Sequence, residues 1–470
     1  MQIMQLFPVF FVHSGMPGQP SSSAFNLLKF NQDIEASLNL RYNFDNKEYS
    51  DEVYGLNITM VTMGSAGDVR PYIVLGNELK KRGHNITLAA FSSFACMSEE
   101  AGLPFFPLSG NAEKFISSIM NPDTNAVTYL PRLYKMLHAI VPDLLRDLED
   151  SCKNADAMVC NYFGSVYYSI AEKLHIPCIQ THFFPMDPTA AIPMSSFRNQ
   201  NLGPAMNKLT YKFAYYAIGT VEGILLSGWR KKSNITKRKP STHPVYRIGN
   251  HEIPVIYAIS PSVFPRPSEW PDNLKMAGFL FDSSSCEWEP PKDLEDFLSI
   301  GEKPVYIGFG SMRTGDMNRM LSIILRSLHA AGLRAVISGA LIGNNRKSNR
   351  KVYFADRYVP HDWLFPRVSA VIHHGGAGTV AAGLRWGCPT WVLPFAGDQP
   401  FWGMQVWRIG CGPRPISREK ITVQKFTEGL LDLTSHAEYK KRAADIADRL
   451  SKENGKSTAA DLIESFIREW

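Results

Sequence analysis

A glycine-rich stretch constrains the fold of this chain more than any other feature. Residues 373–399 read HHGGAGTVAAGLRWGCPTWVLPFAGDQ, and a short apolar strand over 370–372 precedes them. A helix of small residues begins near Thr379, and Gly387 is placed to end it before the next strand, 389–393. The order strand, glycine turn, helix and strand is typical of α/β folds with parallel strands.

The glycine turn predicts an anion site. Gly375, Gly376 and Gly378 leave backbone N–H groups uncovered at a helix N-terminus, where unpaired donors and aligned peptide dipoles favour an anion such as a diphosphate. His374 is placed to donate to the same anion, whereas His373 is interpreted as a strand-end histidine bonded to backbone. A turn that opens a helix without any ligand is the alternative.

Two polar side chains follow the second strand of this unit. Asp398 and Gln399 come after strand 389–393, at its carboxyl end, where open α/β sheets place their ligands. A carboxylate beside an amide can hydrogen-bond the vicinal hydroxyls of a sugar. We therefore expect a sugar next to the anion, while capping of the turn before Pro400 is the alternative role for Asp398.

A second strand–turn–helix–strand unit lies nearer the beginning of the chain. Residues 56–63 (LNITMVTM) predict a strand, residues 64–71 (GSAGDVRP) a turn into a helix, and residues 85–91 the next strand. The glycine spacing differs from the GxGxxG dinucleotide fingerprint, which argues against hydride transfer.

The turn of this unit supplies a candidate acid–base residue. Gly64, Ser65 and Gly67 are expected to shape a turn that faces a cleft, and Asp68 is expected at or near the N-cap of the helix. Capping alone is the alternative role of Asp68, because Asp is a favoured cap in any protein.

The length of the chain predicts more than one domain. Its 470 residues exceed the roughly 250 to 300 at which one hydrophobic core stops growing. We predict an α/β protein in which two Rossmann-like domains face each other across a cleft. The expected segments are an N-terminal extension (1–54), a first domain (55–265), a proline-punctuated linker (266–300) and a second domain with terminal helices (301–470).

One region interrupts the alternation of strands and helices. Residues 183–239 contain aromatic and apolar side chains from Phe213 to Trp229, followed by a basic run over 230–239. Core packing is one interpretation, and an amphipathic element at the entrance for a hydrophobic acceptor or at a membrane surface is the other. His182, just before this region, either lines the acceptor cleft or is a structural histidine.

Composition excludes some classes of function. A net charge of +6 from 50 basic and 44 acidic residues is too mild to indicate nucleic acid. The seven cysteines form no CxxC pair, which fits a reducing compartment. No stretch reaches the ~18 to 20 apolar residues of a membrane span, the N-terminus is a poor secretory signal, and the three Asn-Ile-Thr sites are interpreted as chance matches. We expect a cytoplasmic protein with, at most, peripheral membrane contact.

The two halves of the glycine stretch, HHGGAGT and PFAGDQPFWG, resemble the nucleotide-sugar-binding segment of UDP-glycosyltransferases, most closely the sterol glucosyltransferase branch. The similarity covers about residues 56–465 and is densest over 64–71, 308–312 and 358–412. It implies the GT-B fold of two Rossmann-like domains, with the donor nucleotide on the second domain and the acceptor on the first.

The resemblance also implies roles for individual residues. It assigns the diphosphate to His374, with Ser311 and the turn of Gly376, Gly378 and Thr379. It assigns the sugar to Asp398 and Gln399, and stacking of the base to the neighbourhood of Tyr358 to His361.

Two positions depart from the pattern of the family. Ala66 stands where an Arg is usual in the Gly-Ser-Arg-Gly-Asp motif, so any role of that cation is missing at this position. Ala382 stands where many plant members have a Glu for the ribose hydroxyls, so ribose contacts must come from elsewhere.

The sequence therefore predicts inverting transfer of glucose from UDP-glucose, a co-substrate, to a hydroxyl of a sterol or terpenoid-like acceptor. Asp68 is the expected general base, although a helix N-terminus lowers the pKa of a carboxylate and burial under the acceptor would raise it; His182 is the next candidate. No cofactor or metal is expected, because backbone donors, a helix dipole and His374 can stabilise the leaving diphosphate. The alternatives are transfer of another UDP-sugar, hydrolysis or epimerisation of a nucleotide sugar, and a non-catalytic nucleotide-sugar or lipid-binding protein.

Overall fold

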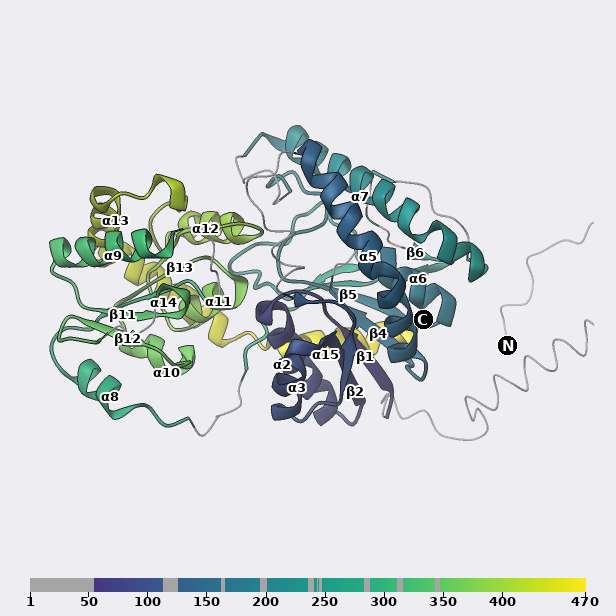
Figure 1. Cartoon of the computed structure of the whole chain (residues 1–470), viewed down its shortest axis with the longest axis horizontal. Coiled ribbons are helices and arrows are strands. Elements are labelled where there is room, and N and C mark those ends of the chain that lie inside the picture. Colours follow the sequence, from purple (N-terminus) through teal and green to yellow (C-terminus); the bar gives the residue numbers. More distant parts are fainter. Residues whose placement is uncertain are drawn as a thin grey trace, which may run out of the picture. The chain divides into compact units, whose positions relative to one another are not determined.

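The computed structural model describes residues 55–112, 126–161, 165–194, 201–235, 241–242, 244, 247–282, 288–310, 316–342 and 347–470. These residues form two parallel sheets with helices on both faces, which confirms the predicted α/β class with two Rossmann-like halves (Figure 1). We call the half built on the first sheet the first lobe and the half built on the second sheet the second lobe. The predicted extension, residues 1–54, lies outside the described residues.

The first sheet has seven strands in the order β3-β2-β1-β4-β5-β8-β9, and every neighbouring pair is parallel. Alternate strand residues face opposite layers: Met158 and Cys160 pack on one side of the sheet, and Ala157 and Val159 on the other. The strands are β1 (Asn57–Val61), β2 (Asn85–Phe91), β3 (Phe105–Leu108), β4 (Ala157–Cys160), β5 (Cys178–His182), β8 (Val255–Tyr257) and β9 (Leu274–Met276).

The second sheet has five strands in the order β12-β11-β10-β13-β14, again all parallel. Short apolar runs such as VYIG and AVIH are buried throughout, as expected for strands covered on both faces. The strands are β10 (Val305–Gly308), β11 (Ala335–Ser338), β12 (Val352–Ala355), β13 (Ala370–His373) and β14 (Thr390–Val392).

Helices cover both sheets. In the first lobe they are α2 (Ala66–Lys81), α3 (Ala95–Glu100), α5 (Ala126–Cys152), α6 (Ser165–Leu174) and α7 (Pro204–Lys232), with a small hairpin of β6 (Arg247–Ile248) and β7 (His251–Glu252). The second lobe contributes α8 (Lys292–Ser299), α9 (Met317–Ala331), α10 (His361–Leu364), α11 (Ala377–Arg385), α12 (Gln399–Arg408), α13 (Val423–Ser435) and α14 (Ala437–Ser451).

The segment between the predicted domains carries regular structure. β9 lies within the predicted linker and forms the last strand of the first sheet, and α8 follows at its far end. An apolar cluster then joins the lobes: Phe264 meets Phe401 edge-to-face at 5.5 Å between ring centroids, and Phe279 lies 5.9 Å from Trp402.

The last described helix, α15 (Gly455–Glu469), returns to the first lobe and packs against α2. Ala459, Ala460 and Ile463 enter the apolar layer that also contains Tyr72 and Leu75. At the crossing between the lobes, Gly455 passes so close to the Phe279 carbonyl that any Cβ on residue 455 would collide with it.

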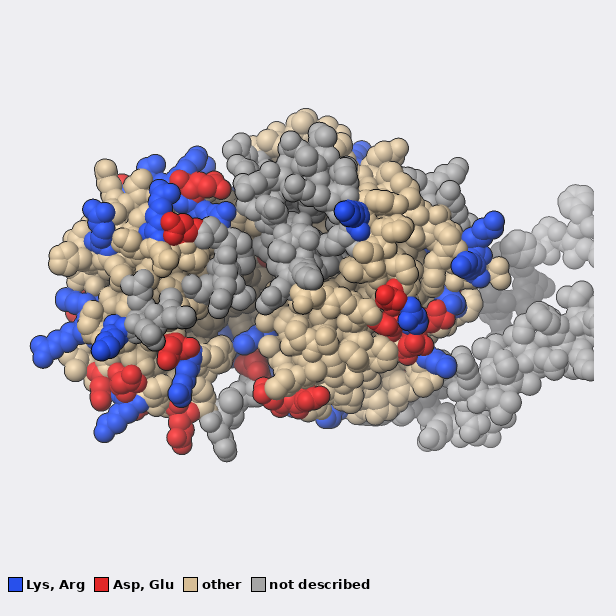
Figure 2. Space-filling view, in the orientation of Figure 1, with Lys and Arg blue, Asp and Glu red and all other residues tan. Residues whose placement is uncertain are grey.

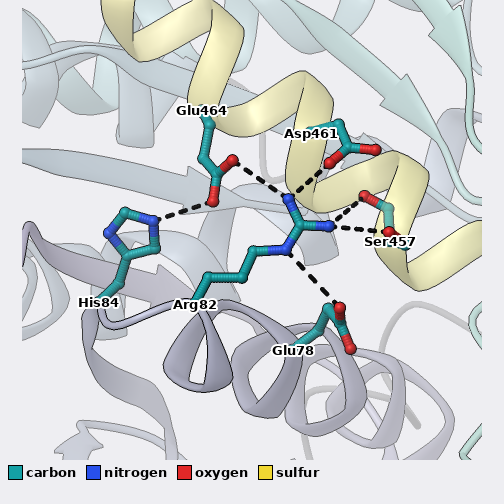
Figure 3. Close-up of polar contacts among 6 residues, drawn as sticks. All are labelled: Glu78, Arg82, His84, Ser457, Asp461 and Glu464. Carbon is teal, nitrogen blue, oxygen red and sulfur yellow. Dashed lines mark hydrogen bonds and ion pairs between the residues drawn. The ribbon is translucent and has the colours of Figure 1, made fainter. Parts of the chain in front are cut away.

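Polar contacts fix α15 to α2 (Figure 3). The guanidinium of Arg82 donates to Asp461 at 2.6 Å and Glu464 at 3.1 Å, and to the Ser457 hydroxyl at 2.8 Å. His84 Nε2 lies 3.1 Å from the other carboxylate oxygen of Glu464. Three side chains of α15 therefore converge on one arginine of the first lobe.

Candidate functional site

The turn after β1 holds Asp68 by a reciprocal cap. Ser65 is the N-cap of α2, and its hydroxyl accepts from the Gly67 N–H at 3.2 Å. Asp68, at the third helical position, accepts at Oδ2 from the Ser65 N–H at 2.7 Å and the Ser65 hydroxyl at 2.9 Å. This is a capping box, with Asp in the usual place of Glu, and both bonds orient the carboxylate.

Gly64 is required by the position of Asp68. Its φ of +151° lies in a region that side chains rarely adopt, and a Cβ there would collide with the Asp68 carboxylate. Burial raises the pKa of Asp68, although its hydrogen bonds to Ser65 act in the opposite direction. Burial therefore outweighs the hydrogen bonds at the start of α2, and the net direction of the pKa is upward, as a general base requires.

The turn after β13 opens α11 as predicted. Gly375 adopts a φ of +97°, and its N–H donates to Nδ1 of the buried His373 at 2.9 Å. His373 is therefore the structural histidine expected at the strand end. Gly376 is the N-cap of α11, and Gly378, in the first turn, is exposed and has open space beside it. Thr379 follows in the same turn, with its N–H bonded to the Gly376 carbonyl at 3.0 Å.

His374 lies over this helix N-terminus. A Cβ on Gly376 would come 2.8 Å from His374 Nε2, and one on Gly310 would come 3.4 Å from Cε1, so the ring lies between the glycine turns that follow β10 and β13. Burial lowers the pKa of His374 to about 4. The ring is neutral near pH 7 and can act as an N–H donor without adding a charge.

Asp398 begins α12 and is held by that helix. Its side chain accepts no cap bond from the helix; instead, its Oδ2 accepts from Trp402 Nε1 at 2.9 Å. Burial, together with the smaller effect of the negative charge of Asp68, raises the pKa of Asp398 to about 7. The two carboxylates of the predicted site, one from each lobe, are therefore close enough to influence each other.

Gln399 has a structural bond in addition to its predicted role. It is buried, and its amide oxygen accepts from the N–H groups of Phe395 at 2.7 Å and Ala396 at 3.2 Å. The carbonyl end of the amide therefore shapes the turn before α12. Its NH₂ group takes no part in these two bonds.

The residues expected near the nucleotide base follow β12, the edge strand of the second sheet opposite β14. Tyr358 is 59% exposed, and its hydroxyl accepts from Arg70 of α2 at 3.1 Å, with the guanidinium 4.9 Å from the ring centroid. His361 stacks on Phe365 at 4.4 Å, and burial together with the positive charge of Arg70 lowers its pKa to about 4. The exposed ring of Tyr358, rather than that of His361, is thus available for stacking.

His182 ends β5 in a buried environment. Its ring lies 5.2 Å from that of Tyr257, and burial lowers its pKa to about 3. The Tyr257 hydroxyl donates to Oδ2 of the buried Asp187 at 2.5 Å, and accepts from the backbone N–H of Asp187 at 3.0 Å. The segment after β5 is therefore anchored beside His182, where the acceptor is expected.

Ser311 lies outside the described residues. Ala66 is the first residue of α2, and Arg70, one turn later, donates to the Tyr358 hydroxyl. Ala382 faces the apolar cluster that includes Val371 and Cys388, so this position points into the core.

Three residues of the site are absent from the sequence prediction. Arg70, Trp402 and Asp187 come from α2, α12 and the segment after β5. Trp402 lies four residues after Asp398, so helical spacing is a signal for it. Arg70 lies two residues after Asp68 on another side of α2, and only its closeness in sequence points to it. Asp187 carries no comparable signal.

Two further features are missing from the described residues. No group of three or more His, Cys, Asp or Glu side chains is arranged to hold a metal ion there. Among the helices described, none combines the length and apolar character needed to cross a membrane.

Two family models match the chain. The glycosyltransferase family 28 N-terminal domain matches residues 58–193, and the C-terminal domain of erythromycin biosynthesis protein CIII-like proteins matches residues 345–464. The first match includes the Asp68 turn, and the second includes His374 and Asp398.

Curated relatives extend the similarity over most of the chain. It is 32% identical to sterol 3-beta-glucosyltransferase UGT80A2 of Arabidopsis thaliana and 30% identical to UGT80B1 of the same plant, each over 88% of this chain. A sterol 3-beta-glucosyltransferase of Debaryomyces hansenii is 31% identical over 87% of this chain. The chain spans 65%, 68% and 26% of the lengths of these three relatives, respectively.

Solved structures share the fold at low sequence identity. The glycotransferase of kitacinnamycin and the calicheamicin glycosyltransferase CalG4 each match 88% of this chain, with a TM-score of 0.65 and identities of 18% and 16%. The matched regions span 100% and 99% of those two chains, respectively. Family models, relatives and fold agree, and the chain belongs to the UDP-glycosyltransferase superfamily with the GT-B fold, alongside the sterol 3-beta-glucosyltransferases.

Proposed function

We propose that the protein transfers glucose from UDP-glucose to a hydroxyl of a sterol or terpenoid-like acceptor, with inversion at the anomeric carbon. The observation that carries this proposal is the contact between the two lobes beside Asp68: Arg70, two residues later, donates to the Tyr358 hydroxyl of the second lobe at 3.1 Å. In agreement with this contact, the charge of Asp68 raises the pKa of Asp398. In a direct transfer, a general base from the first lobe, which binds the acceptor, must lie close to a sugar-binding carboxylate from the second lobe, which binds the donor. The relatives named as sterol 3-beta-glucosyltransferases support the choice of acceptor and sugar.

The chemical step is a single displacement. The acceptor hydroxyl gives its proton to Asp68 as its oxygen forms a bond to the anomeric carbon, and the bond from that carbon to the diphosphate oxygen breaks. The electron pair leaves with UDP. Attack from the face opposite the leaving group inverts the configuration.

In this proposal the two oxygens of Asp68 have different roles. Both bonds from Ser65 end on Oδ2, so we assign proton acceptance to Oδ1. The raised pKa of Asp68 brings its basicity closer to the working pH, which favours general-base catalysis.

The leaving UDP is stabilised by the second lobe. The N–H groups at the start of α11 and the neutral His374 ring donate to the diphosphate as negative charge develops there. Asp398 accepts hydrogen bonds from the glucose hydroxyls, and the NH₂ of Gln399 is the donor of this pair. Asp398→Ala should therefore slow transfer while leaving UDP affinity nearly unchanged.

The nucleotide is the less specified part of the donor. Structures of similar fold hold thymidine diphosphate, among them VinC, which is 16% identical to this chain, and the spinosyn rhamnosyltransferase SpnG, which is 15% identical. Parallel titrations with UDP and thymidine diphosphate show which nucleotide the site prefers, and tighter binding of UDP is the expected result.

Acceptor-dependent release of UDP tests the function. The purified chain, UDP-glucose and a panel of sterols and terpenoid alcohols should yield a product heavier by one hexose. Asp68→Asn retains an oxygen that can accept from the Ser65 N–H but cannot take the proton, so turnover should fall about 100-fold or more while UDP binding persists. UDP binding with no turnover on any acceptor would instead favour the non-catalytic binder. Near-parent turnover of Asp68→Asn would leave Asp68 as a cap, with His182 next to test.

A further inference from the structure

The helix α7 presents two apolar faces, of which one is buried. Its inner face packs against α5 and α6 and includes Val221 and Leu226. Nearer its start, Tyr211 and Tyr215 pack on Met186 and Met194 of the segment after β5, and the Tyr215 hydroxyl donates to the Met186 carbonyl at 2.9 Å. These contacts account for the position of the helix in the first lobe.

The outer face of α7 carries an exposed apolar stripe, which Thr220 interrupts between Tyr216 and Ile224. Its members are each 50% to 60% exposed, although they are large apolar or aromatic side chains: Met206, Leu209, Phe213, Tyr216 and Ile224. At 100° per residue they fall within an arc of about 80°, and at 1.5 Å per residue they extend over about 27 Å. Scattered exposed apolar residues are ordinary, whereas an aligned row of this length marks an interaction surface.

The charges around the stripe are basic. Lys231 and Lys232 are exposed in the last turn of α7, and by helical spacing Lys231 falls on the same arc as the stripe. Arg230 differs, because it is buried and donates to Glu172 at 2.8 Å. Figure 2 shows basic side chains gathered where the carboxyl end of α7 lies in Figure 1, at the right of the view.

Acidic side chains do not offset this charge on α7. Glu222 is the acidic residue of the helix, and by helical spacing it lies on the side away from the stripe. Lys208 and Lys212 are exposed, and Lys212 flanks the stripe. An apolar row bordered by Lys is the pattern of helices that lie in a membrane interface.

We propose that the outer face of α7 docks on an anionic lipid bilayer, with Met206 to Ile224 inserted at the level of the headgroups and with Lys231 and Lys232 against lipid phosphates. The helix lies in the plane of the membrane and does not cross it. A second copy of the chain is a poorer partner for this face, because two such stripes would bring basic ends together without an acidic residue on the arc to pair with them.

This docking deepens the proposed function, on which its purpose rests. A hydrophobic acceptor resides in membranes, and the inner face of the same helix contacts the segment that follows His182. One helix thus borders both the bilayer and the expected acceptor region.

Vesicle flotation with the full chain tests the docking without donor or acceptor. The parent should float with vesicles of phosphatidylcholine and phosphatidylserine at low salt, and binding should weaken at high salt. The triple variant Leu209→Gln, Phe213→Gln, Ile224→Gln should bind at least 10-fold more weakly. The matched control is Ile300→Gln, Trp407→Gln, Leu431→Gln, whose parent residues are also exposed but lie in the second lobe, and it should float like the parent.

The basic end is tested separately. Lys231→Glu with Lys232→Glu should lower binding to vesicles that contain phosphatidylserine more than binding to neutral vesicles. Thermal unfolding of each variant shows whether it folds. The proposal is overturned if the parent does not float, if the stripe variant floats like the parent, or if the stripe variant changes only the sedimentation coefficient, which would identify a second copy as the occupant. These assays contain no substrate, so a negative result would rule out the docking but would say nothing about the proposed transfer reaction, which the release of UDP tests.

Discussion

The indole Nε1 of Trp402 donates a 2.9 Å hydrogen bond to Oδ2 of Asp398, which lies one turn earlier at the start of α12. Trp402 is fully buried, and its ring lies 5.9 Å from Phe279, on the chain segment that crosses between the lobes. The side chain that holds Asp398, the carboxylate proposed to bind the sugar, therefore also belongs to the core that joins the lobes.

Trp402→Phe should impair the sugar step without weakening nucleotide binding. The ring packing is largely kept, but the hydrogen bond that lowers the pKa of Asp398 is lost. A bond to a charged group contributes about 1.5 to 3 kcal/mol, so kcat should fall about 10-fold or more, and the acid limb of the pH profile should move to higher pH. Trp407→Phe, on the exposed side of the same helix, is the matched control. An unchanged pH profile would reduce Trp402 to a packing residue.

The stability of the protein should depend on pH through Asp398. Its pKa is about 7 in the folded chain and about 4 in an unfolded one, so the folded state binds more protons between these values. The stability is thus highest below the unfolded value and falls as the pH rises through about 7. Asp398→Asn cannot ionise, so it avoids this loss of stability at high pH, and its amide oxygen can still accept from Trp402. The Tm of the variant minus that of the parent should therefore be larger at pH 8.5 than at pH 5, by about 2 °C or more.

The same pKa tests the pairing of the two carboxylates. Asp68→Asn removes the negative charge that raises the pKa of Asp398, so that pKa should fall in the variant. The pH dependence of Tm, measured by differential scanning calorimetry in the Asp68→Asn background, should then move to lower pH. An identical curve would mean that the two side chains do not sense each other.

His374→Ala should weaken UDP binding by about 1.5 to 3 kcal/mol, the range for a hydrogen bond to a charged group. Because the pKa of His374 is about 4 in the free protein, the ring is neutral at both pH 6 and pH 8. The loss of affinity, measured by calorimetry, should therefore be similar at the two pH values. His436→Ala, at an exposed histidine before α14, should leave UDP affinity unchanged. Parent affinity in His374→Ala would remove His374 from the donor site.

Arg82→Met should loosen α15 from the first lobe. The change removes donors to Asp461, Glu464 and Ser457 at once, in a partly buried cluster, so the loss should exceed that of a surface ion pair. Hydrogen exchange of the α15 amides should be at least 10-fold faster. The matched control is Arg442→Met, which breaks an exposed pair with Glu438 four residues away and should have little effect. Equal effects of the two variants would show that the cluster is solvated.

The sheets could be predicted from sequence because buried parallel strands are short apolar runs followed by glycine turns. The predicted strands 56–63, 85–91 and 389–393 contain the observed strands β1, β2 and β14, and the predicted strand 370–372 lies within β13. β9 is different: it has three residues amid prolines, and its pairing with β8 depends on the lobe around it. Nor does local pattern reveal that α15 packs on α2, a contact between residues more than 370 positions apart.

The candidate site could be predicted as a set of residues, but not as an environment. Asp68 and Asp398 stand out by their place after glycine turns or strands, whereas the burial that raises their pKa values comes from residues distant in sequence. Likewise, the apolar run from Phe213 to Trp229 is ambiguous by itself. Only the packing of Tyr215 inward and the exposure of Phe213 separate its two faces.

The return of α15 has a consequence for synthesis. A ribosome makes the residues of β1 and α2 early, yet Ala459, Ala460 and Ile463 complete the apolar layer against which those elements pack. The first lobe therefore emerges with an unfilled side and must wait until the whole second lobe has been translated. During that interval its apolar layer is open to chaperones and to aggregation. The first lobe is thus the first to be translated and the last to be completed.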